Sequence, residues 1–388
     1  MINPNPLGYF ERVADGCVSG WLTNENGDPV AVVVQVNGII AATTRPASDT
    51  PGTRREENAR AGRFEVRLCL APGDRVEVFH GITGHPLPGG VRRVVDPRWR
   101  PRVGLVAPAK EEAPYLLEWI AYHRALGIES ILIGDNGGTD HTSELLQALD
   151  AAGMIQRLDW RGEINFQMRF DIDAIQRMRG LTDICSITDV DEFIRPLGGR
   201  SDIPTAVAEI FARKEVSAVG LSWVTYGGSG RVEPGEGLVI ERFTRRAADN
   251  HIRHCVVKAM VRTEQFVGMV NPHVVTVASG EYVNDSGDPI RWTSVPAKAE
   301  FASWNSLRVD HFVVKSRREF EIKAKRGRLN STAQPRDESF FVSRDCNEVF
   351  DPMSADFVER TKDELARLRD RLKRFVPTDS PIQSILHA

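Results

Sequence analysis

The most constraining feature of the sequence is an acidic pair, Asp189 and Asp191, directly after the short apolar run 184–187. This run predicts a buried strand, so the two acids would lie at a strand's carboxyl end, where open α/β sheets bind ligands. With Val190 in extended geometry, both carboxylates would point the same way, because side chains alternate along a strand. Two such carboxylates suit Mg²⁺ or Mn²⁺ shared with a ligand's phosphates. An isolated Asp-x-Asp is more often a solvated strand end, so the flanking sequence must show whether this pair is a metal site.

Strand and helix patterns alternate upstream of the acidic pair. Pro114 suits the first turn of a helix that Gly127 ends, and Asp140 suits the N-cap of the next helix. The predicted strands cover residues 102–107 (ended by Pro108), 130–134, 155–158 and 184–187, and the predicted helices lie within 114–126, 140–149 and 170–179. This alternation predicts an α/β domain with one mostly parallel sheet and helices on both faces.

Residues 1–90 have a different pattern, with several short strands and no helical periodicity. Asn37-Gly38 between two apolar runs predicts a hairpin, and residues 63–70 and 75–79 alternate as half-buried strands do. We therefore expect a small β-sandwich over 1–90, a linker over 91–101, the α/β domain over 102–330 and a C-terminal extension over 331–388 with an amphipathic helix within 355–375. Trp21 is a candidate platform for carbohydrate, although packing in the core is favoured.

Composition limits the class of protein and of partner. The chain has 388 residues and a net charge of −3, which gives no general reason to expect nucleic acid or an anionic membrane as partner. The 5 cysteines are scattered and read as reduced core residues, not as a metal or disulfide framework. No segment approaches the roughly 20 apolar residues that span a bilayer, and no signal pattern is present. We expect a cytoplasmic protein, with peripheral attachment at the inner membrane face as an alternative.

The sequence resembles bacterial glycosyltransferases of the family 2 and family 92-like type over roughly residues 100–330. The matching segments, in order, are 108–119, the loop 135–140, the unaltered Asp-Val-Asp-Glu-Phe at 189–193, then 222–230, 239–243 and 311–327. The chain departs from the family pattern at Glu111, where Asn is common, and at Gly228 and Arg231, where Ser and His are common. The resemblance implies a GT-A-like fold and a metal-dependent, inverting transfer of sugar from a nucleotide-diphosphate donor to a saccharide or other hydroxyl acceptor.

The resemblance also implies roles for individual residues. It assigns Asp191 to the metal and the transfer step, and Asp189 to the donor ribose or a metal-bound water. His311 would complete the metal site, holding Mn²⁺ or Mg²⁺ with the two acids, although a lone His is more often structural. The other expected donor-binding residues are Pro108, Lys110, Glu112, Asp135, Gln167, Arg169 and Lys315, with Lys323 and Arg326 as further clamps on the diphosphate. For Asp135 a turn-capping role is an equal alternative.

An inverting transfer needs a base to take the acceptor proton. Glu233, just after the glycine-rich loop 226–230, is the chosen candidate, with Glu236, Asp310 and Glu192 as rivals. Three other functions are alternatives. A haloacid dehalogenase phosphatase would have Thr or Val in place of Phe193, a nucleotidyltransferase would carry a basic glycine-rich loop early, and a non-catalytic carbohydrate-binding protein would not need the acidic pair.

Overall fold

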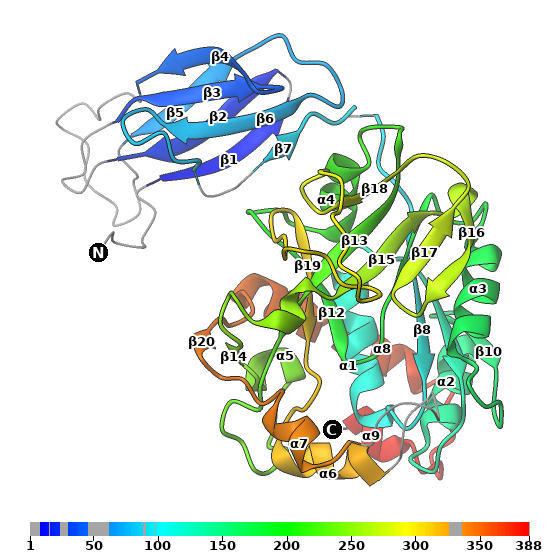
Figure 1. The fold of residues 1–388 in the computed structure, drawn as a ribbon. Helices are drawn as coiled ribbons and strands as arrows, with labels where there is room; N and C mark the ends of the chain where they lie inside the picture. The colour runs from blue at the N-terminus through cyan, green and yellow to red at the C-terminus, as the bar shows by residue number, and fades with distance from the viewer. Residues whose placement is uncertain are drawn as a thin grey trace.

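The computed structural model describes residues 8–14, 16–23, 30–45, 62–87, 91–96, 98–325 and 336–387. The described strands before residue 94 form a small lobe of two antiparallel sheets, and the remaining residues form a larger α/β part (Figure 1). The expected polar loop at 46–61 lies outside the described residues. Within the described part, no helix is long and apolar enough to cross a membrane.

The small lobe is built from two facing sheets that share one apolar core. The first sheet has the order β1-β2-β5 and the second β4-β3-β6-β7. Their strands are β1 (Gly8–Ala14), β2 (Cys17–Leu22), β3 (Val32–Val36), β4 (Ile39–Thr44), β5 (Arg63–Arg67), β6 (Arg75–His80) and β7 (Arg92–Arg93). The predicted hairpin at Asn37-Gly38 is confirmed, and both residues have the positive φ that such a turn requires. Phe10 and Val18 from one sheet meet Val34 and Val78 from the other, as in a sandwich.

Trp21 lies on the outer face of this lobe, so the preference for core packing is wrong. Residues 18, 20 and 22 of β2 are buried, whereas Trp21 is half-buried and lies outside the core cluster. The alternation of side chains along the strand accounts for this placement.

The larger part contains a nine-stranded sheet that is mixed but mostly parallel. Its strand order is β10-β9-β8-β11-β15-β13-β19-β12, with β18 paired beside β13. The strands are β8 (Val103–Ala109), β9 (Ser130–Asp135), β10 (Gln156–Asp159), β11 (Ile184–Ile187), β12 (Glu192–Pro196), β13 (Val216–Thr225), β15 (Val257–Arg262), β18 (Glu281–Asn284) and β19 (Leu307–His311). The first four strands in sequence are parallel, as predicted, and antiparallel β15 lies between β11 and β13.

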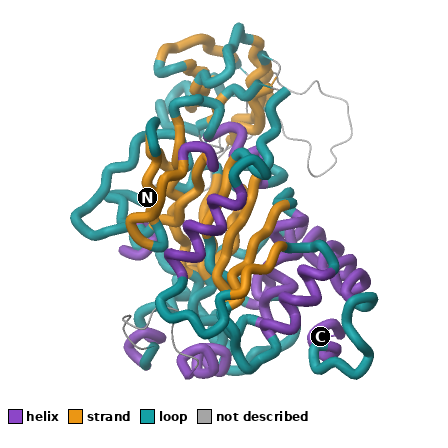
Figure 2. The backbone as a smooth tube through the Cα atoms, turned by 90° about the vertical axis from the view of Figure 1, so that its right-hand side faces the viewer, coloured by secondary structure: helices purple, strands orange, loops and turns teal. Residues whose placement is uncertain are grey.

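Helices cover both faces of this sheet (Figure 2). The larger apolar core contains residues of α1, α2, α4 and α8, whereas α3 packs on the opposite face together with the β16–β17 hairpin. The helices are α1 (Ala113–Ala125), α2 (Thr142–Ala151), α3 (Gln167–Met178), α4 (Ile203–Ile210), α5 (Val239–Arg242), α6 (Arg317–Lys325), α7 (Glu338–Val342), α8 (Ala355–Leu372) and α9 (Gln383–His387). The smaller elements are β14 (Arg245–Arg246), β16 (Phe266–Asn271), β17 (Val274–Val277), β20 (Val349–Phe350), η1 (Ile252–Cys255) and η2 (Thr263–Gln265). The predicted mixed α/β architecture is therefore confirmed.

One sequence expectation about an element end needs correction. The first strand of the domain does not end at Pro108, because β8 continues through Pro108 to Ala109 beside β9. Proline is tolerated there because β11 pairs with β8 only as far as Val106.

The C-terminal helix α8 packs against α1 and contributes Leu365, Leu368 and Leu372 to the main core.

Two consecutive arginines join the small lobe to the larger part. Arg92 forms an ion pair with Glu209 at 3.3 Å and donates to the carbonyl oxygen of Gly198. Arg93 donates to the carbonyl oxygen of Gly287 at 3.3 Å. Both arginines are buried, so the predicted linker is anchored to the larger part.

Candidate active site

The acidic pair lies in a turn between β11 and β12, not in an extended segment. The turn is closed by the Glu192 N–H, which donates to Asp189 O at 3.0 Å, while Glu192 Oε2 accepts from Asp189 N at 2.9 Å. The two carboxylates consequently have different partners, and the expectation of parallel orientation is wrong. The predicted position at the carboxyl end of a central strand is confirmed.

Asp189 is held by two side chains from different elements. Its Oδ2 lies 3.0 Å from the Lys258 ammonium group on β15, and its Oδ1 accepts from Gln167 Nε2 at 3.1 Å. Lys258 also lies 3.3 Å from Glu192 Oε2, and both of these side chains are fully buried. Burial lowers the pKa of Lys258, but the two carboxylates outweigh it and raise the pKa above its usual range. Lys258 therefore carries a permanent positive charge beneath the turn.

Asp191 is paired with a second buried lysine and with a histidine. Lys323, on α6, donates to Asp191 Oδ2, and His311 Nε2 at the end of β19 lies 3.7 Å from the same oxygen. Burial raises the pKa of Asp191, but Lys323 and His311 outweigh burial and hold it well below its usual range. Burial in turn lowers the pKa of Lys323 to about 8. Each acid of the pair thus has its own ammonium counterion.

The expected metal set of Asp189, Asp191 and His311 is only partly assembled. In the described ranges, no three His, Cys, Asp or Glu side chains converge as metal ligands. Asp189 is engaged by Lys258 and Gln167, which leaves Asp191 and His311 as the two neighbouring donors. Mg²⁺ is typically bound through one or two carboxylates together with substrate phosphates. The two donors therefore fit a divalent metal that a bound diphosphate helps to ligate.

Buried polar atoms without partners gather around this turn. Thr188 Oγ1 and Glu192 Oε1 flank the acidic pair, and Thr225 Oγ1 and Trp223 Nε1 lie on β13 beside the β19 strand of His311. None of these atoms has a hydrogen-bond partner among the residues that the structure describes. Buried polar groups are nearly always paired, so such a cluster is typical of a site that a polar ligand completes.

The loops after β8 and β9 hold each other through polar contacts. Asp140 Oδ1 accepts from Thr142 N at 3.1 Å, and its Oδ2 accepts from Ala113 N at 3.0 Å, so one carboxylate serves the first turns of both α1 and α2. Thr142 Oγ1 accepts from the backbone N–H groups of Glu112 and Ala113 at 2.8 and 2.9 Å. Glu111 between these loops has φ +51°, a strained conformation often found at functional sites.

Asp135 is fully buried at the end of β9, and its contacts match the turn-capping alternative. Its Oδ1 accepts from Gly137 N and Ser143 Oγ, both at 2.8 Å, and its Oδ2 accepts from Arg157 Nε at 2.8 Å. These partners occupy both carboxylate oxygens.

The other expected donor-binding residues are spread over several elements. Pro108 is buried within β8, Lys110 and Glu112 lie before α1, and Gln167 touches Asp189. Arg169 is exposed and pairs with Glu163 at 2.8 Å, so it has a surface partner. Lys315 is buried with its ammonium group 4.0 Å from the centre of the Tyr115 ring and has φ +56°. Arg326 lies outside the described residues.

The glycine-rich loop after β13 is explained by close packing. A Cβ atom on Gly228 would lie 2.6 Å from Lys315 O, and Gly228 N donates to Asp345 Oδ1 at 2.6 Å. The glycines therefore allow the loop to lie against residues 315 and 345–347. Glu233 and Glu236 follow on an exposed stretch that ends at α5.

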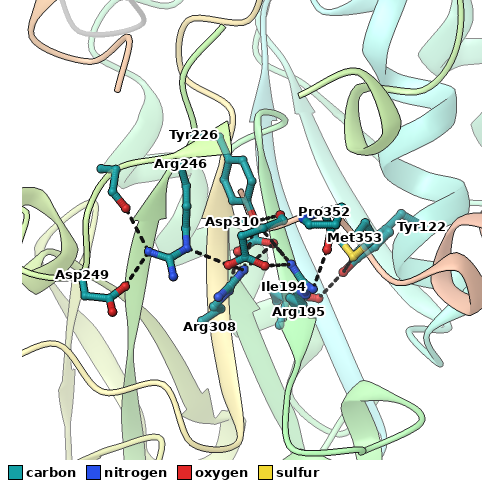
Figure 3. Close-up of polar contacts among 12 residues, drawn as sticks. Tyr122, Ile194, Arg195, Tyr226, Arg246, Asp249, Arg308, Asp310, Pro352 and Met353 are labelled. Atoms are coloured by element: carbon teal, nitrogen blue, oxygen red, sulfur yellow. Dashed lines mark hydrogen bonds and ion pairs between the residues drawn. The ribbon is translucent and has the colours of Figure 1, made fainter. Parts of the chain in front are cut away.

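Asp310, one rival for the base, belongs to a buried ionic network (Figure 3). It lies 2.6 Å from Arg308 Nε and 3.4 Å from Arg195 Nη1, and both arginines also contact Asp351. Since neighbouring side chains of a strand point to opposite faces, Asp310 faces away from His311. Glu192, another rival, is occupied by Lys258 and Asp189 N. Neither carboxylate is placed to receive a proton from an acceptor.

Sequence reasoning missed Lys258 and His273. A lone lysine within the apolar strand 256–261 was a readable signal, because lysine is almost never fully buried unless it is paired. Nothing in the local sequence around His273 indicated that its hairpin would fold over β13 and β15.

The model of glycosyltransferase family 92 matches residues 106–301, which is half of the chain. The chain belongs to glycosyltransferase family 92. A family 92 protein of Oryza sativa subsp. japonica is 25% identical over 170 residues, covering 43% of this chain and 27% of the relative. A family 92 protein of Ricinus communis is 27% identical over 133 residues, covering 34% of this chain and 24% of the relative. The chain thus matches about a quarter of the length of these family 92 relatives.

Among solved structures, the chain matches S. aureus TarS at low similarity. The TarS structure in complex with UDP-GlcNAc has a TM-score of 0.33 at 12% identity, over 72% of this chain and 74% of TarS. The complex of TarS with UDP has a TM-score of 0.30 at 13% identity, over 42% of this chain and 47% of the TarS chain. These values are too low to transfer any site residue from TarS to this family 92 chain.

Proposed function

We propose that this family 92 glycosyltransferase moves a sugar from a nucleotide-diphosphate donor to a saccharide or other hydroxyl acceptor, with inversion at the anomeric carbon and with a GT-A-like core. The observation that carries the proposal is the pairing of two acids with two buried lysines at the carboxyl edge of the sheet. This edge is where open α/β sheets bind their ligands. The resemblance to family 2 enzymes supports the same donor class.

The charges of the site suit a ligand that is itself an ion pair. A metal–diphosphate unit presents a cation for Asp191 and anionic oxygens for Lys323, so both buried charges would keep a partner of opposite sign after binding. Asp191 and His311 would hold the metal, and Asp189 would remain oriented by Gln167 and Lys258. Bound there, Mn²⁺ or Mg²⁺ would neutralise charge on the departing diphosphate.

The remaining side chains have roles that follow from their positions. Lys315 and Lys323 are buried cations next to Asp191, and they would stabilise the negative charge that develops on the leaving group. The backbone around Glu112, fixed by Thr142, would border the nucleoside end of the donor. The transfer also requires a proton acceptor near the incoming hydroxyl group.

Turnover of sugar nucleotides tests this function. The chain would be incubated with UDP-glucose, UDP-galactose, UDP-GlcNAc and GDP-mannose in Mn²⁺, and release of nucleoside diphosphate would be measured. We expect release from at least one donor and none of phosphate from p-nitrophenyl phosphate. Phosphate release from the monoester would favour a phosphatase, and a product that retains the donor's anomeric configuration would overturn the inverting assignment.

A further inference from the structure

His273 lies on the β16–β17 hairpin, which packs over the central strands of the sheet. It lies in the turn between β16 and β17, where its backbone N–H donates to Asn271 Oδ1 at 2.8 Å. Strand β17 contacts β15 and β13, which carry Lys258 and Trp223. The residue as a whole is half-buried.

The hydrogen bonding of the ring defines which nitrogen is free. His273 Nδ1 lies 3.0 Å from the carbonyl oxygen of Val257. A carbonyl oxygen can only accept, so Nδ1 must carry the hydrogen and donate. The neutral ring therefore has its lone pair on Nε2, the state that a general base requires. Burial, aided by the Lys258 ammonium group, lowers the pKa of His273 to about 4, so the ring is neutral at pH 7.

The His273 ring is separated from the proposed metal donors by the indole of Trp223. The centres of the His273 and Trp223 rings are 5.2 Å apart, and the Trp223 ring is 4.4 Å from that of His311. His311 in turn lies 3.7 Å from Asp191. Trp223 Nε1 is buried without a hydrogen-bond partner in the described part of the chain. A reacting sugar over Trp223 would therefore have the leaving-group residues on one side and His273 on the other.

We propose that His273 Nε2 accepts the proton of the acceptor hydroxyl during sugar transfer, an inference that rests on the proposed function. The acceptor oxygen forms a bond to the anomeric carbon of the donor while the bond from that carbon to the diphosphate oxygen breaks. The electron pair of the broken bond leaves with the diphosphate, and the proton moves from the acceptor oxygen to Nε2. The Val257 carbonyl stabilises the resulting imidazolium through the Nδ1–H hydrogen bond.

The alternatives named from the sequence are less well placed. Glu192 and Asp310 are engaged by lysine and arginine partners, whereas Glu233 and Glu236 lie on an exposed stretch with no described contact to the acidic turn. His273 combines a free acceptor atom, a fixed tautomer and a position next to Trp223, and no rival has all three.

Two substitutions separate proton transfer from structural roles. His273→Asn keeps a donor near the Nδ1 position for Val257 O, and His273→Gln places an amide near Nε2 that can accept a hydrogen bond but not a proton. Each variant would be compared with wild type and with His85→Gln, a control on the exposed surface of the small lobe. The measurements are release of nucleoside diphosphate from the four donors above, UDP and GDP affinity by calorimetry, and melting temperature.

We expect both His273 variants to keep nucleotide affinity within about twofold while turnover falls by about 10²-fold or more. His85→Gln should match wild type. Full turnover in either His273 variant, or a loss in Glu233→Gln that His273→Asn does not share, would overturn the inference. Absence of nucleotide binding by wild type would instead overturn the proposed function.

The tautomer offers a test that needs no substrate. Long-range ¹H–¹⁵N spectra of wild type at pH 7, with the His273 signals assigned by their absence in His273→Asn, should show the hydrogen on Nδ1. A hydrogen on Nε2, or an imidazolium, would overturn the proposed role.

Discussion

The ammonium group of Lys258 lies 3.0 Å from Asp189 and 3.3 Å from Glu192, and Lys258 and Glu192 are both fully buried. The same lysine acts electrostatically on Asp171, a buried carboxyl group that has no hydrogen-bond partner among the described residues. Burial raises the pKa of Asp171 and of Glu192 well above the usual range despite Lys258, so this one ammonium group faces three acids beneath the acidic turn. This arrangement makes the folding of the site depend on a residue that has no direct role in transfer.

Lys258→Met should destabilise the protein, because it removes the buried ammonium group that contacts Asp189 and Glu192. Removing one partner of a buried ion pair typically costs about 3 kcal/mol or more in the free energy of unfolding. Urea unfolding would measure this loss. The control Lys373→Met removes an exposed lysine whose ion pair is 3.8 Å long, and it should change stability by less than about 0.5 kcal/mol. Equal stability of the two variants would contradict the role of Lys258.

Asp191→Asn should weaken metal-dependent binding of nucleotide. The substitution keeps the shape of the side chain but removes the charge that would attract a divalent cation. Calorimetry with UDP, GDP and dTDP in Mn²⁺ and in EDTA would report the change. We expect Mn²⁺ to tighten binding to wild type and to the exposed control Asp356→Asn, but not to Asp191→Asn. Equal affinities in Mn²⁺ and EDTA for wild type would exclude a metal at this position.

The stability contributed by Glu118 should depend on pH. This buried carboxyl group on α1 accepts from Val239 N at 2.7 Å and Ile240 N at 3.1 Å, and burial raises its pKa to about 7. The folded protein therefore binds the Glu118 proton more tightly than the unfolded chain does. The stability that this proton contributes is fully present below about pH 4.5 and is lost as the pH rises through 7. Between pH 5 and pH 8 wild type should lose about 2 kcal/mol relative to Glu118→Gln, measured by urea unfolding at both values. A constant difference between the two proteins would contradict this pKa.

Arg92→Met should loosen the small lobe from the larger part. It removes the buried ion pair with Glu209 and the hydrogen bond to Gly198 O, while Arg93 still holds Gly287 O. We expect calorimetric unfolding to split into two transitions or to broaden, with the control Arg98→Met, an exposed arginine in the same segment, unchanged. A single, unshifted transition in Arg92→Met would show that other contacts fix the two parts together.

The sequence predicted elements whose local patterns are strong, and it failed where distant segments determine the contacts. The hairpin at Asn37-Gly38 and the strand before Asp189 could be read directly, because turn chemistry and apolar runs are local signals. The turn that separates Asp189 from Asp191 could not, because Lys258 and Lys323 contact its two carboxylates from positions 69 and 132 residues further along the chain.

The order of synthesis gives the packing of α8 against α1 a kinetic consequence. Helix α1 carries the loop of Glu112 at its start, yet its partner α8 begins at Ala355, about 230 residues after α1 ends. At a synthesis rate of about 5–20 residues per second, the apolar face of α1 would wait roughly ten to fifty seconds for that partner. During translation, α1 would thus be made well before α8, and its packing would be completed only after α8 has been synthesised. A chaperone that shields α1 in this interval would raise the yield of active enzyme more than its stability.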